Sequence, residues 1–253
     1  MISVCIATYN GEKYLKKQLL SILPQLGEGD EVVISDDGST DNTLPMLMSL
    51  GDRRIRLLKH QRLCNDAKYY KTNRTVAANF ENALRNCCGD YIFLSDQDDV
   101  WHPDKVRVMM EFFSTHTNAL CISARTEIDA AGEVTKPLVK LNNYPFLIGL
   151  ITLNYLGSSM AFDRAFLNQA LPFPKDTVTH DGWISMLAKW QKRLFVIDEP
   201  LHLYRRHTKN VTNKTVRVPA WEKIAYRMNL LASIMRRVSQ KKGVNNKKID
   251  NSC

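Results

Sequence analysis

Three carboxylates crowd four residues of the chain directly after an apolar run. Asp96, Asp98 and Asp99 follow the segment Tyr91–Leu94. Carboxylates this close raise one another's pKa unless a cation or buried donors compensate their charge. Alternate residues of an extended segment point the same way, so Asp96 and Asp98 can face one hard cation such as Mg²⁺ or Mn²⁺, with coordination positions left for phosphate oxygens. Taken alone, the triplet is better explained as an acidic turn before a helix that starts near Pro103.

A second acidic pair favours a shared ligand site. Asp36 and Asp37 follow another strand-like run, Glu31–Ile34, and precede a helical pattern. A third polar loop, 8–11, follows the apolar run Ile2–Ala7. In an open, largely parallel sheet, ligands bind outside the carboxyl ends of the strands, where such loops converge. The sequence therefore predicts one site built from three strand ends.

With these three loops in place, the chain resembles the family 2 glycosyltransferases, enzymes of the GT-A fold that use nucleotide-activated sugars. The resemblance runs from Met1 to about Asn210, and the segment Ser95–Trp101 is most similar to the bacterial rhamnosyltransferase branch. It implies an α/β fold with a mostly parallel central sheet flanked by helices. It also implies an inverting enzyme that depends on Mn²⁺ or Mg²⁺.

The resemblance also implies a substrate class. The rhamnosyltransferase branch favours L-rhamnose from a dTDP donor, transferred to a growing cell-surface polysaccharide on a lipid carrier. The same-fold alternative is a hexose or N-acetylhexosamine from a UDP donor. The chain lacks the Gln-x-x-Arg-Trp motif of processive synthases, so one sugar per encounter is expected. A sugar nucleotidyltransferase and a non-catalytic nucleotide-sugar-binding module stay open as other classes, although the loop 8–11 is neither glycine-rich nor basic.

The resemblance assigns the nucleotide to the loops after the first two strands. Five residues are expected to hold the base and ribose: Thr8, Tyr9, Asn10, Asp36 and Asp37. A carboxylate of the acidic pair can accept the N3–H of a pyrimidine, and which of the two does so stays open because neighbours in a strand face opposite ways. Arg74 is expected to reach a phosphate or the base, or else to be solvated at a helix start. Thr75 stands where the family has a glycine, which leaves the path of this loop open.

The resemblance implies Asp98 as a direct metal ligand and Asp96 as a contact to ribose or metal-bound water. His207 is expected as a further ligand through a neutral imidazole, although a structural role fits this lone histidine equally well. Arg205 or Arg206 is expected to stabilise the charge that develops on the leaving diphosphate.

The catalytic base is expected to be Asp181, which precedes a helical pattern. The family has a Glu-Asp pair here, and its Asp deprotonates the acceptor hydroxyl. His180 replaces the Glu, as is compatible with the rhamnosyltransferase branch. The alternative is that Asp181 only caps the helix. Gly157 lies in a small-residue loop that the resemblance places under the donor sugar and acceptor, where glycine permits close backbone approach.

Composition agrees with a globular enzyme without identifying one. The chain has 253 residues, 44% hydrophobic and 24% charged. Its six cysteines form no CxxC pair, and Cys5 and Cys121 lie in apolar runs, so buried reduced thiols are expected. The apolar stretch Phe146–Leu153 is too short to span a bilayer. No basic leader precedes the first strand, so a cytoplasmic protein is expected.

The C-terminal segment 216–253 carries most of the net charge. It has nine Lys or Arg against two acidic residues, which gives +7 of the total +9. Apolar residues recur in it at helical spacing: Trp221, Ile224, Ala225, Met228, Leu231, Ala232, Met235 and Val238. Two explanations stay open. The segment is a basic amphipathic helix that lies on an anionic membrane surface, or its apolar stripe packs on the domain or on a second copy. Nucleic-acid binding is disfavoured by the acidic clusters and the absence of a recognised motif.

Alternating segments predict a parallel sheet covered on both faces. Strands are expected at 55–58, 120–124 and 194–197 in addition to those above, and a hairpin at 129–132. We divide the chain into a nucleotide-sugar-binding half, 1–101, an acceptor-binding half with the catalytic base, 102–215, and the basic tail. The segment Arg62–Lys71 is expected to act as a lid.

Overall fold

A computed structural model of the chain describes residues 1–61, 70–208, 210 and 218–249, with side chains as far as 240. The predicted lid therefore lies outside the described residues, apart from its last two, Tyr70 and Lys71.

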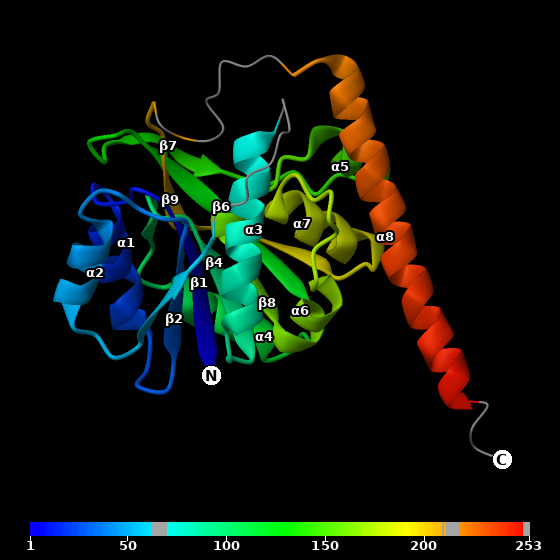
Figure 1. The fold of residues 1–253 in the computed structure, drawn as a ribbon, viewed down its shortest axis with the longest axis horizontal. Coiled ribbons are helices and arrows are strands. Elements are labelled where there is room, and N and C mark those ends of the chain that lie inside the picture. Colours follow the sequence, from blue (N-terminus) through cyan, green and yellow to red (C-terminus); the bar gives the residue numbers. More distant parts are fainter. Residues whose placement is uncertain (62–69, 209, 211–217, 250–253) are drawn as a thin grey trace.

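One mixed sheet forms the centre of the protein (Figure 1). Its strand order is β3-β2-β1-β4-β8-β6-β9-β5, and β7 pairs with β6. The strands are β1 (Ile2–Thr8), β2 (Glu31–Asp36), β3 (Ile55–Lys59), β4 (Tyr91–Ser95), β5 (Val100–Trp101), β6 (Leu120–Ile128), β7 (Val134–Val139), β8 (Met160–Asp163) and β9 (Leu194–Arg205). Strands β1 to β4 are parallel to their neighbours among themselves, as are β6 and β9, whereas β5, β7 and β8 pair antiparallel. The predicted α/β fold with a mostly parallel sheet is confirmed.

Helices cover both faces of the sheet (Figure 1). On one face pack α1 (Leu15–Ile22), α2 (Thr43–Leu50) and α4 (Lys105–Phe113). On the other pack α3 (Lys71–Asn86), α6 (Arg164–Ala170), α7 (His180–Trp190) and α8 (Ala220–Ile249), with α5 (Phe146–Thr152) against α7. Two short 3₁₀ turns, η1 (Leu23–Gln25) and η2 (Gly157–Ser159), complete the elements.

The burial of β1 on both faces explains why its sequence is a continuous apolar run. Val4 and Ile6 pack into the core beneath α1, α2 and α4, whereas Cys5 packs into the opposite core beneath α3. A strand buried on both faces needs apolar residues at every position, because alternate side chains point to opposite faces. Cys5 and Cys121 are buried free thiols, as predicted.

The beginning of α3 corrects one expectation. The segment around Arg74 was predicted as a loop before the helix, but α3 already begins at Lys71. The Thr75 hydroxyl donates to the Lys71 carbonyl at 3.0 Å, one turn earlier. Thr75, which stands where the family has a glycine, therefore lies inside the helix.

The hairpin predicted at 129–132 joins β6 to β7. Asp129 Oδ1 accepts hydrogen bonds from the backbone N–H groups of Ala131, Gly132 and Glu133, and Gly132 has φ of +105°. Glycine reaches this conformation without strain, which explains its place in the turn.

The tail forms the predicted helix, α8, but attaches through a different face. Leu230, Ser233 and Ile234 are buried, and Arg237 donates to the carbonyls of Gln169, Leu171 and Pro172. Most of the predicted apolar stripe is exposed. Within the described residues, no helix is both long and apolar enough to cross a bilayer.

Candidate active site

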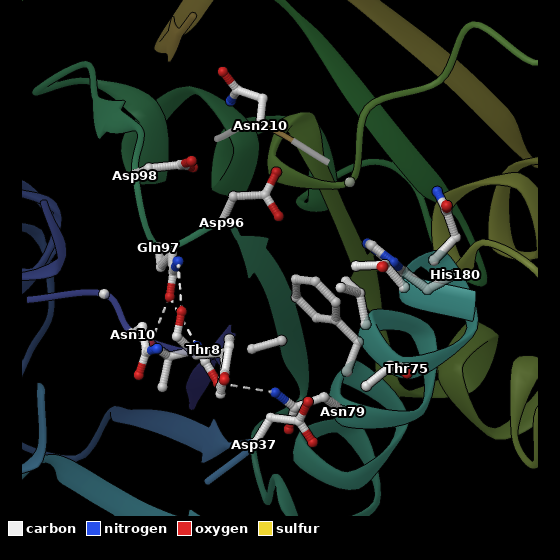
Figure 2. Close-up of a pocket in the computed structure, with 18 of the residues that line it drawn as sticks. Thr8, Asn10, Asp37, Thr75, Asn79, Asp96, Gln97, Asp98, His180 and Asn210 are labelled. Carbon is white, nitrogen blue, oxygen red and sulfur yellow. Dashed lines mark hydrogen bonds between the residues drawn. The ribbon is translucent and has the colours of Figure 1, made fainter. Parts of the chain in front are cut away.

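A cavity of about 510 Å³ opens at the carboxyl ends of β1, β2 and β4. The N-terminal parts of α3 and α7, the turn η2 and the end of β9 complete its wall. Figure 2 shows Asp98, Asp96 and Asn210 towards one end, Asp37 and Asn79 towards the other, and His180 and Thr75 along a third side. The three loops predicted to converge do so.

Hydrogen bonds of the Gln97 side chain join the loop after β4 to the loop after β1. Its Oε1 accepts from Thr8 Oγ1 at 2.7 Å and from the Tyr9 backbone N–H at 2.9 Å. Its Nε2 donates to the Tyr9 carbonyl at 3.2 Å, and Asn79 Nδ2 donates to the Thr8 carbonyl at 3.2 Å. Sequence reasoning missed both amides. The signal was weak: Asn79 is a buried polar residue within the apolar stripe of α3.

Asn10 joins the same loop to the loop after β2. It has φ of +50°, its backbone N–H donates to Ser39 Oγ at 2.9 Å, and its Oδ1 accepts from the Thr40 backbone N–H at 2.8 Å. Thr8, Tyr9 and Asn10 all line the cavity, as expected of residues that hold a nucleotide.

The two carboxylates after β2 have different surroundings. Asp36 Oδ2 accepts from the backbone N–H groups of Gly38 and Ser39, at 3.0 and 2.9 Å, and Asp36 does not line the cavity. Asp37 does, with Oδ1 2.8 Å from His60 Nδ1. The expectation for Asp36 is therefore corrected, because its side chain shapes its own loop, and Asp37 is the member of the pair that can meet a ligand.

Asp98 and His207 meet across 109 residues of sequence. Asp98 Oδ2 lies 2.7 Å from His207 Nε2, and both side chains line the cavity. The two rings of Tyr14 and His207 pack with centroids 5.1 Å apart, which steadies the imidazole.

This pair fits a divalent cation. Carboxylate oxygen and imidazole nitrogen are both ligands of Mn²⁺ and Mg²⁺ sites. Within the described residues, no group of three His, Cys, Asp or Glu side chains is placed to hold a metal. Two protein ligands suffice where phosphate oxygens and water supply the others, as is usual for Mg²⁺.

Positive charge only partly compensates the carboxylates of Asp96, Asp98 and Asp99. Although Asp96 borders the cavity, desolvation raises its pKa well above the usual range, and the charges of Asp99, Asp98 and Asp181 raise it further. Burial followed by the charge of Asp98 raises the pKa of Asp99 to about 7. Lys105 lies beneath them, fully buried, with Nζ 2.5 Å from the Ser158 carbonyl and over the Trp101 ring. Burial lowers the pKa of Lys105 to about 7, so its charge only partly compensates the cluster.

Asp181 faces the acidic end from the opposite wall. It occupies the first turn of α7 and lines the cavity, and its charge acts on Asp96. The N-cap of α7 is Thr179, whose Oγ1 accepts from the Gly182 N–H at 3.2 Å. Asp181 Oδ1 accepts from the same Gly182 N–H at 2.7 Å. Asp181 is therefore not the N-cap residue, although its carboxylate binds a backbone N–H of the first turn, and its role as base stays a prediction.

His180 and Gly157 fit together beside Asp181. The His180 ring stacks on Phe80 with centroids 4.0 Å apart, and burial lowers its pKa. A Cβ on Gly157 would lie 2.3 Å from His180 Nε2, so only glycine fits. Gly157 lines the cavity, and the group that approaches it is the His180 side chain. Its place under the donor sugar and acceptor stays a prediction.

The predicted arginines lie outside the cavity. The Arg205 guanidinium donates to the carbonyls of Asp98, Asp129 and Ala130, and Arg206 Nη1 lies 3.5 Å from Glu127. Arg74 Nη1 lies 3.9 Å from Asp176. Because none of these three lines the cavity, the expectation that they contact the nucleotide or diphosphate is not supported. Among the described residues that line the cavity, Lys13 is the only one that is a lysine or an arginine. Sequence reasoning did not find it.

Comparison with known proteins agrees with this geometry. The family model described as glycosyl transferase family 2 matches residues 3–171. The dTDP-rhamnosyl transferase RfbG of Shigella flexneri is 27% identical over 228 residues, covering 81% of this chain and 72% of that protein. Curated relatives are longer, and the chain spans between 31% and 72% of the length of five of them.

Two solved structures share the fold. S. aureus TarS in complex with UDP-GlcNAc superposes with a TM-score of 0.63 at 18% identity, covering 93% of this chain and 72% of that one. A mannosyltransferase from Pyrobaculum calidifontis in complex with GDP-Man and Mn²⁺ superposes with a TM-score of 0.58 at 18% identity, covering 94% and 64%. At these identities the likeness shows the GT-A fold alone. The family match over two thirds of the chain, together with the shared fold, leads to one conclusion: this chain belongs to glycosyl transferase family 2.

Proposed function

We propose that the enzyme transfers one sugar per encounter, with inversion and with a divalent cation, to a growing surface glycan. The observation that carries this proposal is the contact between Asp98 and His207 in the same cavity as Asp37 and Asp181. One cavity thus holds a candidate nucleotide contact, a candidate metal pair and a candidate base. The proposal keeps the division into a donor half, 1–101, and an acceptor half, 102–215.

The proposal gives roles to several of the lining residues. Asp37 accepts from the base of the nucleotide, and Thr8, Tyr9 and Asn10 surround base and ribose. Asp98 and His207 hold Mn²⁺ or Mg²⁺, which when bound neutralises charge on the leaving diphosphate. Lys13 takes the phosphate role first expected of the arginines, because it is a cation on the cavity wall.

Asp181 is the base for the acceptor. Its carboxylate removes the proton of the acceptor hydroxyl while the hydroxyl oxygen bonds to the anomeric carbon and the bond from that carbon to the diphosphate oxygen breaks. Attack from the face opposite the leaving group inverts the configuration. A general base of this kind contributes about 10²- to 10⁴-fold to the rate.

The donor we favour is dTDP-L-rhamnose. Similarity to a dTDP-rhamnosyl transferase over most of the chain supports it, as does the Ser95–Trp101 segment. A UDP-hexose or UDP-N-acetylhexosamine is the second candidate, because TarS binds UDP-GlcNAc on the same fold. The acceptor in this proposal is a lipid-linked glycan, which the enzyme reaches by reversible attachment to the membrane surface.

The experiment is a donor panel that needs no acceptor. Release of dTDP or UDP from each nucleotide sugar, with Mn²⁺ and with chelator, identifies donor and metal dependence together. We expect turnover of dTDP-rhamnose that chelator abolishes. Undiminished turnover in chelator would remove the metal from the proposal.

Two variants separate the roles. Asp98→Asn should lose metal-dependent binding of nucleoside diphosphate. Asp181→Asn should keep donor affinity within a few fold but lose transfer, because a missing base raises the barrier and leaves ground-state binding intact. Transfer by Asp181→Asn at the unaltered rate would move the base elsewhere, with His180 the next candidate.

A further inference from the structure

Two neighbouring helices expose large apolar side chains. On α5, Leu147, Ile148 and Ile151 are 68%, 44% and 63% exposed. On α8, Trp221, Ile224 and Met228 are 64%, 61% and 59% exposed. We call these six residues the α5–α8 surface. Single exposed apolar residues are ordinary, but such a concentration marks a surface that another phase or molecule covers.

Helix α8 carries apolar residues on two opposite sides. With 3.6 residues per turn, the buried Leu230 and Ile234 lie on the side away from Trp221, Ile224 and Met228. Attachment to the domain therefore uses one side only. The exposed side is not needed to hold the helix in place, so its apolar character has another cause.

The surface adjoins the acceptor side of the cavity. Arg227 of α8 donates to the Ile151 carbonyl, which joins the two helices. From α5 the chain reaches Leu156, which lines the cavity, within four residues. A hydrogen bond of 3.2 Å links Tyr226 of α8 to Thr179 in the cavity wall. Figure 1 shows α5 and the first turns of α8 at the end of the molecule where β1, β2 and β4 finish.

The charge around the surface is positive. Helix α5 has no charged residue. The first turns of α8 carry Lys223 and Arg227 against Glu222, and the segment 216–253 as a whole carries +7. Two copies that buried this surface against each other would bring like charges together. An anionic lipid surface would instead attract the charges at about 1 kcal/mol for each basic residue near it.

We infer that the α5–α8 surface docks on an anionic lipid bilayer, with the six apolar side chains inserted at the headgroup boundary. The inference deepens the proposed function, on whose lipid-linked acceptor it rests: docking places the acceptor side of the cavity at the membrane. The predicted tail is thus half of the contact, and α5 supplies the other half.

The test uses the full chain and vesicles of phosphatidylglycerol mixed with phosphatidylcholine, compared with pure phosphatidylcholine. The unaltered protein should sediment with the anionic vesicles and dissociate at high salt. Leu147→Ser/Ile151→Ser/Ile224→Ser should weaken the apparent partition constant by roughly tenfold or more, because three apolar side chains are lost from the interface. Lys223→Glu should also weaken the binding to anionic vesicles, and the loss should be larger at low salt than at high salt.

The matched control changes two apolar residues exposed elsewhere, Leu20 (56%) on α1 and Met48 (70%) on α2. Leu20→Ser/Met48→Ser should bind vesicles as the unaltered protein does, and all variants should keep its rate of donor hydrolysis. The inference is overturned if the unaltered chain ignores anionic vesicles, if the triple variant binds them fully, or if light scattering shows that the triple change only dissociates a dimer. Failure of donor hydrolysis with every nucleotide sugar would count against the proposed function and would leave the vesicle result standing.

Discussion

At the scale of single residues, the cavity depends on one contact that a methyl group would destroy. His180 Nε2 occupies the place where a side chain at position 157 would begin, 2.3 Å from an ideal Cβ. The stacking of His180 on Phe80 leaves the ring little room to retreat. The pair therefore shapes the wall beside Asp181.

We expect Gly157→Ala to lower the free energy of unfolding by about 1 to 3 kcal/mol, since added volume in a packed site forces its neighbours to shift. Donor affinity should fall as well. Urea unfolding and nucleotide titration measure the two effects.

A second substitution separates this clash from a general effect of alanine. Gly157→Ala/His180→Ala should recover most of the stability lost by Gly157→Ala, because the clashing atom is gone. Gly29 has no atom within 4 Å of a built Cβ, so Gly29→Ala should be close to neutral. Equal losses at both glycines would contradict the clash.

Sequence alone located the polar residues at strand ends but could not orient them. The sequence does not distinguish the role of Asp36 from that of Asp37. The structure does, because the backbone of Gly38 and Ser39 binds the Asp36 carboxylate, whereas Asp37 lines the cavity. The resemblance implied that Arg205 or Arg206 contacts the diphosphate. Three carbonyls from distant segments bind Arg205 instead, and sequence patterns do not reveal such tertiary contacts.

At the scale of elements, Arg205 joins the end of β9 to two other segments. Its backbone N–H donates to Asp99 Oδ1 at 2.9 Å, and its guanidinium binds the Asp98 carbonyl and the turn after β6. The ring of Tyr14 lies against the guanidinium and also against His207. One buried side chain thus holds both candidate metal ligands in register.

We predict that Arg205→Lys raises the Mn²⁺ concentration needed for half-maximal donor hydrolysis by tenfold or more, a loss of about 1.4 kcal/mol. An ammonium keeps the charge but cannot donate along the directions of the planar guanidinium. Stability should fall too, by about 1 to 3 kcal/mol, because buried carbonyls lose their donor.

Arg206→Lys is the matched control. Arg206 is half exposed and pairs with Glu127 outside the cavity, so the metal requirement should stay unchanged. A loss of nucleotide affinity in this control would restore the phosphate role first expected of Arg206.

The elements themselves were largely predictable. The strands from β1 to β4 lie within two residues of the segments expected from apolar runs. A strand buried on both faces, such as β1, β2 or β4, leaves a continuous apolar signal. The edge strand β3 is only partly buried. The first turn of α3 was not predictable from a family pattern with glycine. The exposed face of α8 was predicted as an apolar stripe, but its second, packing face was not seen, because Tyr226 and Arg237 contribute to it with polar groups.

At the scale of the whole molecule, stability should depend on pH through a buried histidine. His202 in β9 is fully buried, with Nε2 3.4 Å from Ser158 Oγ. Burial, followed by the charges of Lys105 and Arg125, lowers its pKa well below the usual range. The unfolded chain therefore binds the proton more readily than the folded one, so this contribution to stability is lost as pH falls below about 6.5.

We expect His202→Gln to flatten the fall in unfolding free energy between pH 7.5 and 5, as measured by urea denaturation. The raised pKa of Asp99 acts in the opposite sense, because the folded state then binds the proton more readily. The difference between variant and unaltered protein is therefore the quantity to compare. His102→Gln, at a side chain 46% exposed, should leave the slope unchanged, and an identical slope in His202→Gln would refute the assignment.

The pairing of β6 with β9 has a consequence for how this chain can change in length over evolution. β9 runs beside β6 from Leu194 to Arg205, and His207 follows two residues later. The pairing has register shifts earlier in β9, but it is regular from Leu203 to Arg205. An insertion or deletion of one residue in this last part of β9 would turn the later side chains to the other face of the sheet and carry His207 away from Asp98. Length changes should therefore be excluded from the last residues of β9. The length of the strand therefore sets the position of His207 relative to Asp98.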